Sequence, residues 1–538
     1  MAILSKSLES SKSPKDTTWG SFSNRAPWNL NEQECLDFDA KTNEIRAEVH
    51  YEASKLLEKK HFVPIGRMIV AVLRIGVAVS SWYIFDKRKG REKSYKSISR
   101  KLRKQFVHLG STYIKLGQII SSGEGLFPNE LVDEFKLLRD QVEPEKYFDI
   151  KNVIEKDFGR PLETIFSSFN KQPLAAASIA QVHEATLITG EKVVVKVQRP
   201  QVNALVKKDI KALTWLAPKM VGRIPVTALA NPPALVEVFC ETISEELDFR
   251  LEAQSMLEVA RVFVQTNQNS IVVPRPYISM VTKRVLVMEQ MYGFALDDVD
   301  SIRAADIDTK EFLRAGLISF LEGALIYGVF HGDLHGGNLF VQTDGKTALF
   351  DFGITGHFNE LQRKAFMRLI IAGMSGDIEQ QLVALLDLGA FPKDTNLKEV
   401  MDDLGLNDPV KDPVKMSSDQ LTDELKNLTK KLLGYGAHAP KELLLFVKNL
   451  MFLDGATGAL APDLDILGEI SHVYTYFMSE YGAKIFEDLQ IDGDELKFDK
   501  NALLDSMRVE DKVDTLTYQQ LRTRREIIKK RMMDKVDD

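Results

Sequence analysis

One polar segment constrains the fold of this chain more than any other part of the sequence. Residues 331–353 read HGDLHGGNLFVQTDGKTALFDFG: an Asp follows a His-x pair, an Asn comes shortly after it, and Asp-Phe-Gly closes the segment. Residues 339–341 and 347–350 are short apolar runs on either side of Asp344-Gly345, a dipeptide typical of a two-residue hairpin turn. The segment therefore predicts two polar loops joined by a short β-hairpin.

The polar residues of this segment suit a phosphate-bound cation. Mg²⁺ prefers oxygen ligands, and Asp351 and Asn338 supply a carboxylate and a neutral side-chain oxygen, so we expect them to bind Mg²⁺ beside ATP. Asp333 is the predicted catalytic carboxylate that orients or deprotonates the attacking group. For His335, a contact with substrate and a packed or solvent-facing position both stay open. The order and spacing of these two polar motifs are those of a protein-kinase-like fold.

Such a fold needs an N-terminal lobe, which the chain supplies upstream. Residues 181–188 and 191–197 are predicted as two strands, and the second (EKVVVKV) carries Lys196 among valines. We expect Lys196 to bind the phosphates of ATP. The alternative is a lysine whose stem packs on the strand while its amine reaches solvent.

A long helical pattern at residues 236–265 contains the expected partner of Lys196. Glu252 is the candidate, and three neighbouring acids compete with it: Glu245, Glu246 and Asp248. Residues 285–289 (VLVME) are predicted as a buried strand that leads into a hinge. The backbone amides from Glu289 to Met291 are expected to meet adenine there.

The sequence departs from ordinary protein kinases at three places. A glycine-rich phosphate loop is replaced by AAASIAQVH at residues 175–183, where Ala176, Ala177 and Ser178 are the predicted ATP-contacting positions of a stiffer loop. Gly332 replaces an arginine. No Ala-Pro-Glu motif follows Asp-Phe-Gly. Instead, Asn359 is predicted to cap a helix that begins at Glu360. Little activation segment is left for a protein substrate.

With these motifs together, the chain resembles the UbiB/AarF-type atypical kinases, a family associated with ubiquinone and other isoprenoid-lipid metabolism. The resemblance covers about residues 90–390. It is carried by the alanine-rich loop, Lys-x-Gly-Gln at 115–118, Glu-x-Asp at 246–248, VKVQRP around Lys196, HGDLHGGN and DFG.

The resemblance implies an α+β, two-lobed kinase-like fold with an N-terminal helical extension and an enlarged helical C-lobe. It also implies that the extension folds over the site, with Lys115 and Gln118 directed at the nucleotide and at the Glu246/Asp248 pair. That arrangement would block peptides and favour ATPase or small-molecule chemistry. Two departures are the polar, basic C-terminus, where some bacterial members have membrane helices, and residues 121–126 (SSGEGL) in place of Arg-x-Asp-Leu.

Four regions are expected from these motifs and from composition. They are a disordered tail at 1–39, a helical extension at 40–160, a kinase-like N-lobe at 161–290, and a C-lobe with helical additions at 291–538. The 538 residues, 44% hydrophobic and 27% charged, are typical of a globular protein with two lobes and additions. A net charge of −7 gives no support for nucleic-acid binding. Two isolated cysteines favour a reducing compartment.

No transmembrane helix is predicted, because Arg67 and Arg74 interrupt the apolar residues 62–85. The ten Lys and Arg residues between 86 and 104 follow this stretch directly. Together the two segments predict either an interfacial helix on an anionic membrane or a solvated linker helix over the core. The basic residues 522–535 are expected to be helical, as a second surface contact or a frayed tail. We expect a cytoplasmic protein, with peripheral membrane association if the first alternative holds.

The sequence thus predicts a Mg²⁺- and ATP-dependent atypical kinase or ATPase that serves isoprenoid-quinone or related lipid metabolism at a membrane surface. A lipid-derived or other small acceptor is the expected partner. Two alternatives stay open: a true protein kinase, and a nucleotide-switched scaffold with little turnover. The sequence does not specify the acceptor or the oligomeric state.

Overall fold

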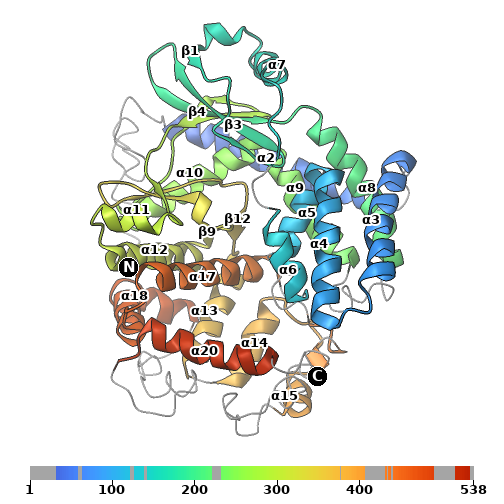
Figure 1. The fold of residues 1–538 in the computed structure, drawn as a ribbon. Coiled ribbons are helices and arrows are strands. Elements are labelled where there is room, and N and C mark those ends of the chain that lie inside the picture. Colours follow the sequence, from blue (N-terminus) through green and yellow to red (C-terminus); the bar gives the residue numbers. More distant parts are fainter. Residues whose placement is uncertain are drawn as a thin grey trace.

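A computed structural model describes residues 32–58, 64–121, 127–138, 142–220, 232–375, 377–405, 431–432, 434–437, 440–489 and 515–533. These residues form a small lobe built on a β-sheet, a larger helical lobe below it, and a layer of helices that flanks both (Figure 1). The expected two-lobed α+β architecture is therefore confirmed.

The small lobe is built on a sheet with the strand order β1-β3-β4-β7-β6, and β2 pairs with β3. Its elements are β1 (Phe166–Phe169), β2 (Ala175–Ala176), β3 (Ala180–Leu187), β4 (Lys192–Gln198), β6 (Pro276–Val281), β7 (Val285–Glu289), α7 (Tyr147–Phe158) and the 3₁₀ turn η1 (Leu162–Thr164). The predicted strands at 181–188, 191–197 and 285–289 are confirmed. Alternate valines of β4 are fully buried against Ile150 and Ile154 of α7. Helix α7 thus belongs to this lobe, and the lobe begins before the expected boundary at 160.

The helical pattern predicted at 236–265 is two helices rather than one. Helix α9 (Pro232–Glu246) ends just before Asp248, and α10 (Phe249–Gln265) begins just after it. The Asp248 side chain accepts a hydrogen bond from the Arg250 backbone N–H and has extended backbone angles. These are the properties of an N-cap, which starts a new helix instead of continuing the old one.

The flanking layer contains the N-terminal helices and one helix that follows β4. They are α2 (Glu32–Leu57), α3 (Ile65–Phe85), α4 (Arg91–Leu109), α5 (Ser111–Ser121), α6 (Asn129–Lys136) and α8 (Val202–Met220). The expected disordered tail at 1–39 is wrong for residues 32–39, which form the start of α2. Cys35 is fully buried there and Asp39 pairs with Arg261 of α10. Residues 1–31 lie outside the described part of the chain.

The larger lobe is mainly helical. Its helices are α11 (Val299–Ala304), α12 (Thr309–Leu321), the π-helix η3 (Glu322–Tyr327), η4 (Gly336–Asn338), α13 (Glu360–Ser375), α14 (Ile378–Asp387), α15 (Leu397–Leu404), α17 (Lys441–Leu460), α18 (Ile466–Leu489) and α20 (Tyr518–Met533). Its strands are β5 (Ile271–Val272), β8 (Phe294–Ala295), β9 (Val329–His331), β10 (Leu339–Val341), β11 (Thr347–Leu349) and β12 (Thr355–His357). The predicted β10–β11 hairpin is confirmed, and Asn359 caps α13 by accepting from the Gln362 N–H at 2.9 Å.

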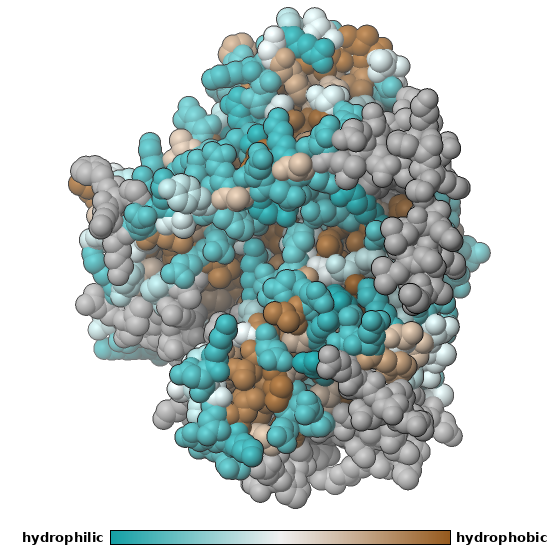
Figure 2. Space-filling model, turned by 180° about the vertical axis from the view of Figure 1, so that it is seen from behind, coloured by the Kyte–Doolittle hydropathy of each residue, from teal (hydrophilic) through white to brown (hydrophobic). Residues whose placement is uncertain are grey.

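Two helices of the described residues, α3 and α17, are long and apolar enough to cross a membrane by length and composition alone. Helix α17 packs with one face against α12, α20 and β12 of the large lobe. Helix α3 contacts α4 and α8 on one side only and exposes most of its apolar side chains. Seen from behind, the molecule presents a largely hydrophilic face with smaller apolar patches (Figure 2).

An aromatic cluster holds α17 in the large lobe. Phe446 is 2% exposed, and its ring centroid lies 4.4 Å from that of Phe366 and 4.9 Å from that of Phe320. Phe330 and Phe358 complete the cluster.

We predict that Phe446→Ala lowers the free energy of unfolding by about 3–5 kcal/mol, because it removes a buried ring and leaves a cavity. Urea unfolding measures the change. Val447→Ala on the same helix is the control, since Val447 is 43% exposed and should change stability little. Equal effects of the two substitutions would contradict the packing described here.

Candidate active site

Lys196 lies at the centre of the site and contacts two carboxylates. Its Nζ atom is 2.7 Å from Glu252 Oε1 and 3.1 Å from Asp351 Oδ1. Alternation along β4 buries the neighbouring valines on one face and turns Lys196 toward α10 and the Asp-Phe-Gly segment. Burial alone would lower the pKa of Lys196, but the charges of Asp351 and Glu252 outweigh it and hold that pKa above its usual range. The lysine therefore stays protonated and does not reach into solvent.

The structure selects Glu252 from the four candidate acids. Glu252 lies in the first turn of α10, is buried, and is the one of the four that pairs with Lys196. The other three have other partners: Glu245 pairs with His50 and Lys441, Glu246 with Lys115, and Asp248 with Arg250. The helix start set by Asp248 is what brings Glu252 to face β4.

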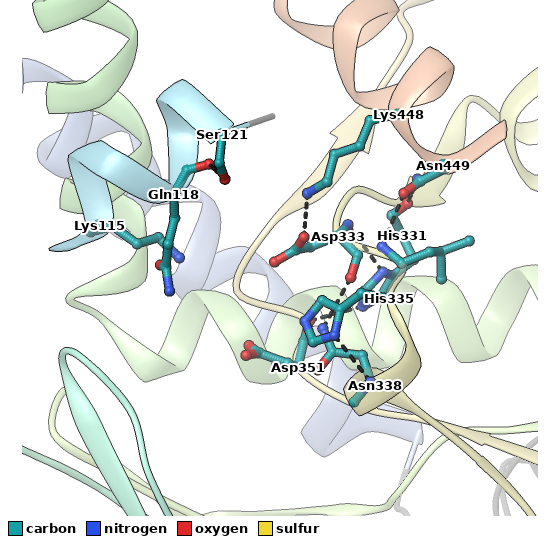
Figure 3. A network of polar contacts seen from close by, with 12 residues as sticks. Lys115, Gln118, Ser121, His331, Asp333, His335, Asn338, Asp351, Lys448 and Asn449 are labelled. Carbon is teal, nitrogen blue, oxygen red and sulfur yellow. Dashed lines mark hydrogen bonds and ion pairs between the residues drawn. The ribbon is translucent and has the colours of Figure 1, made fainter. Parts of the chain in front are cut away.

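The flanking helix α5 presents Lys115 and Gln118 toward Asp333 and Asp351 (Figure 3). Lys115 Nζ lies 2.8 Å from Glu246 Oε1, and both side chains are largely buried. Burial raises the pKa of Glu246 against the opposing effect of Lys115. Of the two acids expected near Lys115, Glu246 is the one it pairs with, whereas Asp248 caps α10 and pairs with Arg250.

The loop after β9 is fixed by hydrogen bonds between side chains and backbone groups. Asn338 Nδ2 donates to the Asp333 carbonyl at 3.0 Å. This hydrogen bond uses the amide nitrogen, so the Asn338 side-chain oxygen is the atom that can bind a cation. His331 Nδ1 accepts from the Asp333 N–H at 3.2 Å, and Nε2 donates to the Asp351 carbonyl at 2.8 Å. Burial lowers the pKa of His331, so the neutral ring links this loop to the Asp-Phe-Gly segment.

The glycine that replaces arginine before Asp333 lies in a crowded part of the backbone. A Cβ atom on Gly332 would lie 2.8 Å from Ile354 Cγ2 and 3.0 Å from the Ile354 carbonyl oxygen. The chain segments of β9 and β12 lie close together there, so a larger residue would require Ile354 to shift. His335 accepts from the Gly337 N–H and begins η4, which fits the packed alternative for this residue.

Asp351 has a left-handed backbone, with φ of 56°. This conformation costs a non-glycine residue about 1–3 kcal/mol and is found where the surroundings impose it, often at functional sites. Phe352, 1% exposed, holds the segment in place. Burial raises the pKa of Asp351, but the lysines Lys196 and Lys115 more than reverse this and lower it to about 2.

Helix α17 contributes two residues that the sequence analysis did not identify. Lys448 pairs with Asp333, 115 residues away in sequence. Asn449 is fully buried, donates to the His331 carbonyl and accepts from the Leu334 N–H at 2.9 Å. The sequence feature that could have pointed to them is the polar Lys-Asn pair within the apolar run PKELLLFVKNLMFL. This run predicted only a core helix.

The alanine-rich loop is a tight hairpin turn between β2 and β3. The Ala177 N–H donates to the Ala180 carbonyl at 2.8 Å, and Ser178 is buried. Arg199 Nε donates to the Ala177 carbonyl, and the same guanidinium pairs with Glu145. Ala176 forms a bridge to Gln181. The turn is therefore held by its own strand pairing and by the Arg199 side chain, an arrangement consistent with a stiff loop.

The hinge differs from the prediction at Glu289. The Glu289 N–H donates to the Arg275 carbonyl at 2.9 Å, and the Gln290 N–H to the Lys192 carbonyl at 3.3 Å. Both amides thus serve the sheet, and the expected contact of the Glu289 amide with adenine is wrong. Within the described residues, the Met291 amide makes no backbone hydrogen bond.

Charge in the site is nearly balanced. Its members are the lysines Lys115, Lys196 and Lys448 and the acids Glu246, Glu252, Asp333 and Asp351. With all groups ionised, the acids exceed the lysines by one. Asn338 and Asp351 offer the oxygen ligands that Mg²⁺ takes from proteins when phosphates supply others, so this donor set fits the metal.

Comparisons with known proteins show which family the chain is similar to. Residues 137–384 match the family model described as the ABC1 atypical kinase-like domain. An uncharacterized protein of Mycobacterium tuberculosis is 32% identical over 73% of this chain and 81% of its own length. An uncharacterized chloroplastic aarF domain-containing protein kinase of Arabidopsis thaliana is 31% identical, over 68% of this chain and 72% of its own.

A third relative is named probable protein kinase UbiB, from Photobacterium profundum. It is 30% identical to this chain over 69% of each protein. The motifs, the two-lobed fold and these matches lead to one conclusion: the chain belongs to the ABC1 atypical kinase-like family, which includes UbiB and aarF-domain proteins.

Proposed function

We propose that this protein binds Mg²⁺ and ATP between its lobes and acts as an atypical kinase or ATPase in a small-molecule or lipid pathway. One observation carries the proposal: Lys196 contacts Glu252 and Asp351 at once. This contact connects the small lobe, α10 and the Asp-Phe-Gly segment. It brings together the residues that phosphoryl transfer in kinases requires.

Each residue of the site has a proposed role. Lys196 binds the α- and β-phosphates, and Glu252 holds the lysine in place. Asn338 and Asp351 hold Mg²⁺, which when bound neutralises phosphate charge. Asp333 orients the hydroxyl or water that attacks the γ-phosphorus and accepts its proton. Its low pKa suits orientation better than strong proton abstraction, since Lys448 and Lys115 keep it ionised despite burial.

The nucleotide is proposed to contact further residues around this centre. Ala176, Ala177 and Ser178 lie in the stiff turn above the phosphates, and Met291 offers the hinge amide for adenine. Lys115 and Gln118 close the site from α5. With α5 on that side and α13 starting nine residues after Asp351, little surface is left for a peptide.

Two other functions are kept as alternatives. The names of the UbiB and aarF relatives contain the words protein kinase, which supports a protein acceptor. Stoichiometric, Asp333-dependent phosphorylation of a partner protein would favour that alternative. A nucleotide-switched scaffold is the second. It would bind ATP without releasing phosphate.

The pathway proposed is isoprenoid-quinone or related lipid metabolism, which rests on the family. Cells that lack the protein should contain less quinone, and unchanged quinone content would contradict this part of the proposal.

We predict that the protein hydrolyses ATP in a Mg²⁺-dependent manner. The rate should fall at least about a hundredfold in Asp351→Asn, because this variant lacks the carboxylate proposed to hold Mg²⁺ beside the phosphates. Phosphate release by the purified protein measures it, with and without anionic liposomes. Asp344→Asn is the matched control: it makes the same chemical change at an exposed turn and leaves an Asn-Gly hairpin. ATP-dependent stabilisation without phosphate release would favour the scaffold.

A peripheral membrane location is proposed from the arrangement of α3. Arg67, which had counted against a membrane helix, points inward: its Nε is 2.6 Å from Asp209 Oδ1 of α8, a fully buried carboxylate. The opposite face exposes Ile69, Leu73 and Val77, one helical turn apart. A spanning α3 would leave Asp209 buried and unpaired, which is costly. An interfacial helix keeps the ion pair.

The basic segment that follows α3 supports this location. Asp86 pairs with Lys89 and Lys101, so part of the positive charge is used internally. Other cations of the segment are exposed: Lys87, Arg88, Lys93, Lys96, Arg100 and Lys104. Each would contribute about 1 kcal/mol near an anionic surface.

We predict that the double substitution Leu73→Asp/Val77→Asp reduces co-sedimentation with phosphatidylglycerol-containing vesicles, because it puts charge on the apolar face. Raising the salt concentration should weaken wild-type binding. Leu361→Asp is the control, since Leu361 is 78% exposed on α13, away from this face. Equal binding of the double variant and wild type would exclude α3 as the contact.

A further inference from the structure

We infer that Lys448 is a positioning residue for Asp333, so that helix α17 completes the catalytic loop from outside the stretch matched by the family model. The matched stretch ends at residue 384. The inference rests on the proposed ATP-dependent chemistry and names a residue that this chemistry needs.

The catalytic loop lacks a cation of its own. Between His331 and Asn338 the sequence reads HGDLHGGN, without lysine or arginine. A Cβ atom on Gly332 would crowd the side chain and the carbonyl oxygen of Ile354, which disfavours a larger residue at that position. The cation that pairs directly with Asp333 comes from another element, α17.

Lys448 is placed to act on the Asp333 carboxylate. Its Nζ pairs with Asp333 Oδ1, and the two side chains are 20% and 23% exposed. In Figure 3, Lys448 extends from α17 to Asp333, while Lys115 and Gln118 lie on the opposite side of that residue. A half-buried ion pair of this kind fixes the direction of the carboxylate more firmly than an exposed one.

The next residue of α17 fixes the backbone on both sides of Asp333. Asn449 donates to the carbonyl of His331 and accepts from the N–H of Leu334. Consecutive residues of one helix thus hold the side chain and the backbone of the same aspartate. The aromatic contacts of Phe446 anchor the helix that carries them.

Placement of a catalytic group affects rate more than nucleotide binding. A carboxylate that is misdirected by about 1 Å loses much of the advantage of proximity, while Lys196, Asn338 and Asp351 can still hold the nucleotide. Loss of Lys448 should therefore lower kcat and leave KM for ATP nearly unchanged.

The test compares Lys448→Met, Lys448→Arg and wild type in Mg²⁺-dependent phosphate release. We expect kcat of Lys448→Met to fall by at least about tenfold, with KM for ATP within about twofold, and Lys448→Arg to regain part of the rate. Lys441→Met is the matched control: Lys441 lies on the same helix but pairs with Glu245. It should keep the wild-type rate.

Several results would overturn the inference. They are an unchanged kcat in Lys448→Met, a rise in KM alone, or a loss of rate explained by a smaller folded fraction. A double-mutant cycle of Lys448→Met and Asp333→Asn in urea unfolding tests the contact without turnover. We expect non-additive effects, and additive ones would overturn the inference. If wild type shows no Asp351-dependent turnover, the proposed function fails, while the cycle still decides whether Lys448 fixes Asp333.

Discussion

A buried cluster of lysines and carboxylates determines how the parts of this protein meet. Lys196 of β4, Lys115 of α5 and Lys448 of α17 each pair with an acid from another element. Moving ions out of water is expensive, and such pairs add little net stability compared with apolar packing. Removing one partner is costly, however, because a buried charge is left behind. The cluster therefore specifies the arrangement of the lobes and the helical layer more than it stabilises them.

The sequence was most informative where local chemistry decides the structure. The β10–β11 hairpin follows from its Asp-Gly turn, and the cap at Asn359 from side-chain hydrogen bonding to the helix start. Lys196 was identifiable because it stands between valines within an apolar strand. These features depend on residues that are close in sequence, so a pattern suffices to find them.

The sequence was less informative where distant segments decide. One acid among four pairs with Lys196, and the choice depends on a helix break at Asp248 that periodicity did not show. Lys448 lies 115 residues from Asp333, and only the packing of α17 brings them together. The Glu289 amide was assigned to adenine, although strand pairing with Arg275 uses it. Long-range packing overrides local expectation in each case.

The flanking layer contributes to two parts of the molecule that the proposed function uses. Helix α5 brings Lys115 to the site, while α3 keeps Arg67 turned inward against Asp209 and its apolar face outward. One layer thus connects the proposed nucleotide site with the proposed membrane contact. Helices α3, α4 and α5 follow one another in the chain, so only α4 separates the proposed membrane helix from the helix that carries Lys115.

Lys196, Asn338 and Asp351 are proposed to form one Mg²⁺- and ATP-binding site. Calorimetric titration of the purified full-length protein with ATP, in the presence and absence of Mg²⁺, tests it most directly. We predict ATP binding that requires Mg²⁺ and is weakened at least about tenfold in Lys196→Met, since a charge-assisted contact to phosphate is lost. Binding of equal affinity in wild type and Lys196→Met, or binding indifferent to Mg²⁺, would contradict it.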